Sequence, residues 1–150
     1  MSWLKISALA IPFVIVVYFA SLSYLTRHNK IKSEGDRQLM PCPSTPNCVS
    51  SRATEPSRKI AAFPLDITHK AASWKKLISA IKTAGGKMLV DDSRYAHAVF
   101  TSPLFRFKDD LEVELKGDHI DIRSASRAGK SDLGQNRKRV NKIRQIYLQK

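Results

Sequence analysis

Alternation of apolar and polar residues dominates the second half of the chain. Four stretches show it: KMLVDD, YAHAVFTS, DDLEVELKG and HIDIRSAS. In the third, Leu111, Val113 and Leu115 point one way along an extended chain, and the glutamates between them point the other way. Gly117 and Asp118 separate the last two stretches and favour a hairpin turn. The pattern predicts an antiparallel sheet with one face on a core and one face in water.

Two stretches with helical periodicity flank these strands. The first, within residues 68–86, has an apolar stripe formed by Trp74, Leu77, Ile78 and Ile81. The second, within residues 132–150, has a stripe formed by Asn136, Val140, Ile143 and Tyr147. A further strand is predicted within residues 59–66, where Pro64 restricts it to an edge or a strand end. The predicted fold class is α+β, with an antiparallel sheet of four to five strands and two helices on one face, in a compact domain at residues 59–150.

The N-terminal part of the chain is apolar. From Ile6 to Leu25 there is no charged residue, and a helix of that length extends about 30 Å, the thickness of a bilayer's hydrocarbon core. We therefore predict a transmembrane helix within residues 1–25 that anchors the protein. A cleaved signal peptide is the alternative, with Lys5 before the apolar run and Ser21 and Ser23 near a cut. A buried helix of a soluble core is the third interpretation.

Residues 26–58 have the composition of a tether, because they are polar, contain several prolines and have no apolar period. The two cysteines of the chain, Cys42 and Cys48, lie within it. An isolated pair this close is typical of a disulfide in an oxidising compartment. Charge indicates the opposite location. Arg27, Lys30 and Lys32 outnumber Lys5 across the apolar run, which favours a cytoplasmic domain under the positive-inside rule.

The chain is strongly basic, with 26 lysines and arginines, 13 acidic residues and a formal net charge of +13. Such a charge attracts anionic lipid head groups, nucleic acid and other acidic polymers. Basic residues beside a membrane span bind anionic lipid, and four follow the apolar run: Arg27, Lys30, Lys32 and Arg37. The charge therefore favours a membrane over nucleic acid as the partner.

Residues 128–131, AGKS, resemble the end of a phosphate-binding P-loop. A P-loop also needs a parallel sheet and a glycine five residues before Gly129, where this chain has Ser124. The P-loop interpretation is therefore rejected. A basic loop before a helix N-terminus remains, and helix N-termini attract anions. Its candidate ligand-binding residues are Arg123, Ser126, Arg127, Lys130, Asp132, Asn136 and Arg137.

A structural interpretation of the same residues is also open. Asp132 can occupy the helix end itself, and with Gln135 it resembles a capping box. The arginines can pair with the acidic residues of the preceding strands, which are Asp109, Asp110, Glu112 and Glu114.

The sequence contains no recognisable catalytic or metal-binding motif. The four histidines, His28, His69, His97 and His119, lack the spacing of zinc ligands. We predict no metal and no cofactor. An enzyme acting on an acidic substrate is one alternative function, with Asp110 or Asp132 as the acid–base group and the arginines holding the anion.

Three ordered blocks carry a resemblance to a known family: CPSTPNCVSS at 42–51, YAHAVFTSPLFRFKDDLEVEL at 95–115 and IRSASRAGKSDLGQNRKRV at 122–140. Over residues 42–148 the chain resembles the domain of unknown function family numbered 1499. The resemblance implies a compact domain, often behind an N-terminal membrane or export signal, and assigns no activity. The family's characteristic positions are here Cys42, Pro43, Asn47, Cys48, Ser50, Phe105, Asp109, Asp110, Arg123, Ser124, Ser126, Arg127, Gly129, Asp132, Asn136, Arg137 and Arg139.

Together these observations predict a single-pass membrane protein whose basic domain binds an anionic ligand or lipid head group in an envelope role. The family's frequent export signal favours the non-cytoplasmic, periplasmic side for the domain. The enzyme is the first alternative, and nonspecific binding of nucleic acid is the second and the less favoured partner.

Overall fold

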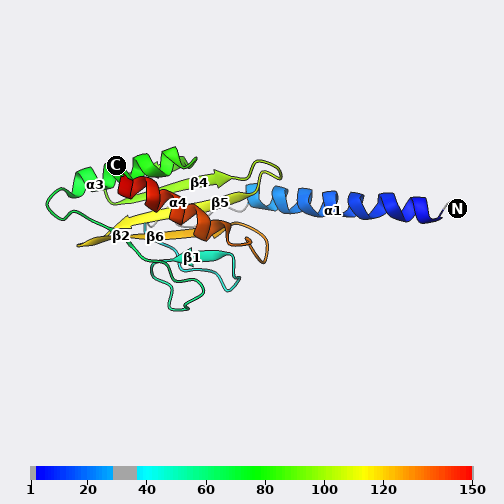
Figure 1. The fold of residues 1–150 in the computed structure, drawn as a ribbon, viewed down its shortest axis with the longest axis horizontal. Helices are drawn as coiled ribbons and strands as arrows, with labels where there is room; N and C mark the ends of the chain where they lie inside the picture. The colour runs from blue at the N-terminus through cyan, green and yellow to red at the C-terminus, as the bar shows by residue number, and fades with distance from the viewer. Residues whose placement is uncertain (1–2, 29–36, 150) are drawn as a thin grey trace.

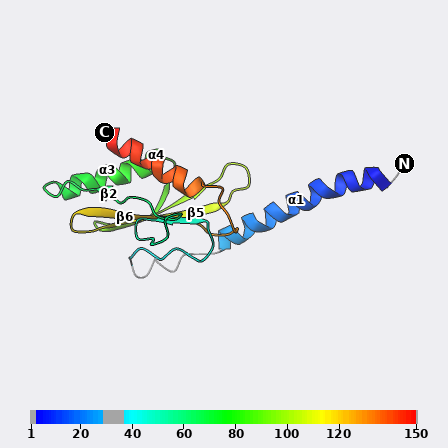
Figure 2. The ribbon, with the colours of Figure 1, turned by 60° about the horizontal axis from the view of Figure 1, so that its bottom comes forward.

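The computed structural model describes residues 3–28 and 37–149 of the chain (Figure 1). Helices α3 (Lys70–Thr83) and α4 (Gln135–Gln149) lie on one face of an antiparallel sheet, and helix α1 (Trp3–His28) extends away from it (Figures 1 and 2). The predicted α+β class and the two helices on one face are confirmed. Lys30 and Lys32, which the sequence places after the apolar run, lie outside the described residues.

The strands are β1 (Cys48–Ser50), β2 (Phe63–Pro64), β3 (Lys87–Asp91), β4 (Tyr95–Thr101), β5 (Lys108–Leu115) and β6 (His119–Ser126). Their order is β1-β6-β5-β4-β3, with β2 also paired to β6, and every pairing is antiparallel. The described part of the sheet thus has six strands rather than the predicted four to five. The strand that was missed is β1, which lies in the segment predicted as a tether. Its three residues are too few to show alternation.

The core lies between the sheet and the two helices. Leu111 and Val113 of β5 and Ile120 and Ile122 of β6 point towards the helices and are fully buried. The apolar stripes predicted for the helices face them, because Trp74, Leu77, Ile78, Ile81, Val140, Ile143 and Tyr147 all belong to the same cluster.

The opposite face of the sheet is covered, and the prediction of a face in water is wrong. Asp110 and Glu112 of β5 are 2% and 0% exposed. The segment leading to β1 runs along this side of the sheet, opposite α3 and α4 (Figure 2). The backbone N–H of Leu39 donates to Glu114 Oε2 at 3.1 Å, and a disulfide between Cys42 and Cys48 joins the segment to β1. Alternation within β5 cannot reveal this cover, because it comes from a distant part of the chain.

The C-terminal part of helix α1 packs against the domain. The Phe19 ring stacks on Phe105 of the β4–β5 loop with 4.5 Å between ring centroids, and Ser23 and Thr26 are buried. Towards the N-terminus the helix exposes large apolar side chains, which are Ile11, Phe13, Val14, Ile15, Val16, Val17 and Tyr18.

The predicted transmembrane span is not supported. The apolar run is helical, but no helix in the part of the chain that the structure describes is both long and apolar enough to cross a bilayer. Part of the run is instead engaged with the domain through Phe19 and Ser23.

Candidate functional site

The seven residues of the predicted ligand site lie in one region, formed by the second half of β6, the β6–α4 loop and the first turn of α4. Two of its arginines are engaged in ion pairs within the sheet. Arg127 donates to both carboxylate oxygens of Asp110, at 2.7 and 2.8 Å, and Arg123 pairs with Glu112. The side chains of Arg123 and Arg127 are 9% and 11% exposed, so they present little charge to a ligand.

Asn136 and Asp132 hold the loop that precedes α4. The buried amide of Asn136 donates to the backbone oxygen of Asn47 at 2.9 Å and to Ser126 Oγ at 3.1 Å. Asp132 accepts hydrogen bonds from the backbone N–H groups of Gly134 and Asn136, at 3.1 and 2.7 Å. Its carboxylate thus takes the place that a bound anion would take at the start of this helix.

Arg137 and Lys130 complete the predicted set. The guanidinium of Arg137 donates to the backbone oxygens of Ser57 and Lys59, at 2.8 and 3.1 Å, and so ties α4 to the chain after β1. Lys130 is exposed, and none of the described residues forms an ion pair with it. Six of the seven predicted residues therefore have structural contacts, and Lys130 remains available.

Asp110, a candidate acid–base group, has two side-chain partners. His97 Nε2 lies 2.8 Å from Asp110 Oδ1, the oxygen to which Arg127 also donates. Burial raises the pKa of Asp110, but the hydrogen bonds from His97 and Arg127 and the charge of Arg127 outweigh it, so that the pKa lies below its ordinary value. A buried carboxylate held in this form is typical of a structural ion pair and is poorly suited to proton transfer near neutral pH.

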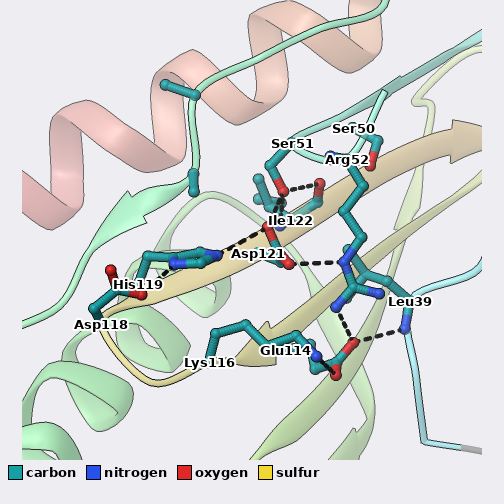
Figure 3. A network of polar contacts seen from close by, with 12 residues as sticks. Leu39, Ser50, Ser51, Arg52, Glu114, Lys116, Asp118, His119, Asp121 and Ile122 are labelled. Atoms are coloured by element: carbon teal, nitrogen blue, oxygen red, sulfur yellow. Dashed lines mark hydrogen bonds and ion pairs between the residues drawn. The ribbon is translucent and has the colours of Figure 1, made fainter. Parts of the chain in front are cut away.

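A second ion-pair network lies on the same face of the sheet (Figure 3). Arg52 donates to Asp121 Oδ2 and Glu114 Oε2, both at 2.7 Å. Burial raises the pKa of Asp121, but the hydrogen bonds from Ser51 and Arg52 lower it by more than burial raises it. The pKa therefore lies below its ordinary value. Because Glu114 also accepts the N–H of Leu39, the network attaches residues 39 and 51–52 to strands β5 and β6.

Ser51 in this network is not arranged as a nucleophile. Its hydroxyl donates directly to Asp121 Oδ1 at 2.6 Å, while His119 lies on another side of that carboxylate, with Nε2 3.5 Å from it (Figure 3). A serine nucleophile needs a base such as imidazole at its own hydroxyl. Metal binding has no ready site either, because the described residues contain no group of three or more metal-ligating side chains.

The family comparison agrees with the resemblance seen in the sequence. A model of the family described as a protein of unknown function, DUF1499, matches residues 38–146. The chain belongs to this family. Among curated proteins and solved structures, no match is found.

Several positions that are characteristic of the DUF1499 family contact one another at the base of the β6–α4 loop. The Asn47 amide donates to the backbone oxygen of Gly129 at 2.6 Å, and Ser124 Oγ donates to Asn136 Oδ1 at 2.7 Å. These contacts fix the loop to the segment before β1. They explain the positions structurally and assign no ligand.

A different set of cations lies at the end of the domain where α1 packs. The β4–β5 loop (residues 102–107) and the β6–α4 loop (residues 127–134) both lie at this end (Figures 1 and 2). We call it the α1 end. Its cations without an ion-pair partner among the described residues are Arg27, Arg106, Lys108 and Lys130.

Lys108 lies close enough to other cations to be repelled by them. Burial lowers the pKa of Lys108, and the nearby charges of Arg106, Arg127 and Arg27 lower it further. Among the described residues, ion pairs leave this positive charge without compensation, and a bound anion would relieve the repulsion at Lys108.

The two loops of the α1 end also carry exposed leucines. Leu104 is 78% exposed and Leu133 is 83% exposed. Sequence reasoning missed both residues. The only local signal was a leucine beside a turn residue, in PLFR and DLGQ, which is too short to be specific.

Proposed function

We propose that this protein binds an anionic lipid surface through its α1 end. The observation that carries the proposal is the coincidence, at one end of the domain, of cations with no ion-pair partner in the described part of the chain, two exposed loop leucines and the exposed apolar side chains of α1. Cations contact anionic head groups and apolar side chains enter the interface below them, so a surface with both matches a membrane boundary. Nucleic acid would use the cations but would leave the leucines in water.

In this proposal, the apolar side chains of helix α1 attach the protein to the lipid. Its side chains from Ile11 to Tyr18 are exposed and large, and contact with acyl chains would remove them from water. The proposal does not depend on whether α1 crosses the bilayer, because a helix can also lie in the interface.

The disulfide between Cys42 and Cys48 supports an oxidising location for the domain. We therefore place it in the proposal on the non-cytoplasmic side, with an envelope role. No observation on the described residues favours an enzyme over this function.

Vesicle flotation of the full chain tests the proposal. Binding to vesicles that contain phosphatidylglycerol should exceed binding to pure phosphatidylcholine and should fall as salt is added. The double variant Arg106→Gln/Lys130→Gln removes two cations of the α1 end. At about 1 kcal/mol each, it should weaken partition onto anionic vesicles about thirty-fold.

Lys70 and Lys75 provide a matched control. Both are exposed on the first half of α3, away from the α1 end (Figure 1). Lys70→Gln/Lys75→Gln changes the net charge equally and should leave partition within about threefold of the parent. Equal loss in both double variants would mean that net charge, and not the α1 end, governs binding.

A further inference from the structure

A pocket of about 450 Å³ lies between helix α1 and the β6–α4 loop. Its volume falls in the range of roughly 300–1,000 Å³ that is typical of small-molecule sites. One wall comes from α1, through Tyr18, Phe19 and Leu22, and the opposite wall from Phe107 and Ala128. The walls are therefore largely apolar, and the pocket lies at the α1 end.

Polar and charged residues also line this pocket. Lys130 is one of them and forms no ion pair with any described residue. The two carboxylates that also line the pocket are already engaged, since Asp109 pairs with Arg139 and Asp132 accepts two backbone N–H groups at the start of α4. Lys130 is thus the one cation among the residues that line this pocket, and it has no ion-pair partner among the described residues.

The loop that forms one wall is held in place before any ligand binds. Asn47 donates to the backbone oxygen of Gly129 at 2.6 Å, and the backbone N–H of Arg127 donates to Lys108 O at 3.1 Å. Gly129 has φ of 89°, a left-handed conformation that suits glycine. A wall fixed in this way lowers the cost of ordering a ligand.

We propose that this pocket binds one molecule of an anionic phospholipid, with an acyl chain against Phe19, Leu22 and Phe107 and the head-group phosphate at Lys130. The proposal rests on the proposed function and deepens it, because it adds a discrete lipid site to a surface that contacts many lipids. Apolar walls with a single cation among the lining residues match an amphiphile, and they exclude free phosphate as a good occupant.

Lipid counting by native mass spectrometry tests the site. The full chain is released from nanodiscs made of equal parts phosphatidylcholine and phosphatidylglycerol. The parent should retain one phosphatidylglycerol, and Lys130→Gln should reduce the retained fraction about fivefold. Leu22→Trp, which fills the pocket from α1 without touching the domain core, should abolish retention. Ile15→Trp, at an exposed α1 position that does not line the pocket, should retain the lipid as the parent does.

The possible failures are distinguishable. If the parent floats with anionic vesicles but retains no lipid, or if Leu22→Trp retains it as well as Ile15→Trp, the discrete site is wrong and the lipid-surface function stands. If the parent shows no preference for anionic vesicles, the proposed function itself is wrong. Equal retention of phosphatidylcholine and phosphatidylglycerol would also contradict the proposed site, because Lys130 would then give no preference for the anionic lipid.

Discussion

The charged residues fall into two groups, according to the partners that the fold gives them. Arg123 and Arg127 pair with buried carboxylates of β5, whereas Arg106 and Lys130 have no ion-pair partner among the described residues. The sequence shows all four as cations in a basic chain. The sequence cannot tell paired from exposed cations, because the pairing depends on which strands are neighbours in the sheet.

The ion pair of Asp110 is expected to be a principal contributor to the stability of the domain. Replacing one partner of a buried pair leaves the other uncompensated and costs about 3 kcal/mol. We predict that Asp110→Asn lowers the free energy of unfolding by about this amount at neutral pH, whereas Asp118→Asn, at an exposed side chain, changes it by less than about 0.5 kcal/mol. Thermal and denaturant unfolding of the full chain in a mild detergent measures both values.

The same variant has a predicted dependence on pH. The pKa of Asp110 is lowered in the folded protein, so its contribution is complete above the unfolded pKa of about 3.9 and is lost as the pH falls through the folded value. The difference in stability between the parent and Asp110→Asn should therefore shrink as the pH is lowered below about 4. A difference that stays constant down to pH values near 2 would contradict the role of this carboxylate.

Among the elements, those with a regular pattern were predictable and those without one were not. The alternation of β5 and the stripe of α3 identify both elements and their buried sides, because each has enough residues to show a period. Strand β1 has three residues and no period. The water-facing side of β5 was predicted wrongly because a segment around Leu39, far away in sequence, covers it.

The candidate site follows the same rule. The β6–α4 loop was recognisable as basic, but of its predicted residues only Lys130 is a cation without an ion-pair partner in residues 3–28 and 37–149. The contribution of Arg27 and Leu104 depends on α1 and the β4–β5 loop lying together, which no local pattern encodes.

The disulfide is predicted to hold the covering segment on the sheet. Without it, a small loop regains freedom in the unfolded state, and the Cys42→Ser/Cys48→Ser variant should lose about 2 kcal/mol of stability. Exchange of the Leu39 amide with deuterium should become faster, since its bond to Glu114 depends on the segment staying in place. The amides in the middle of β5 serve as the internal reference. If the exchange rate of the Leu39 amide relative to them did not change, the ion pairs alone would be enough to hold the segment on the sheet.

At the scale of the whole molecule, the two ends of the domain differ in what they expose. The α1 end carries Leu104, Leu133 and cations that pair with no described carboxylate, while the last turns of α4 place the exposed Leu148 away from α1 (Figure 1). A lipid surface that binds the α1 end would therefore leave Leu148 in water. This orientation is the central claim of the proposed function.

Tryptophan fluorescence tests this orientation most directly. Leu133→Trp and Leu148→Trp each place a reporter at an exposed leucine, and the spectrum of the parent chain is subtracted from each. We predict that phosphatidylglycerol vesicles shift the Leu133→Trp emission to shorter wavelength and that brominated lipid quenches it, with neither effect on Leu148→Trp. Equal shifts at the two positions, or a shift at Leu148→Trp alone, would contradict the claim that the α1 end faces the lipid.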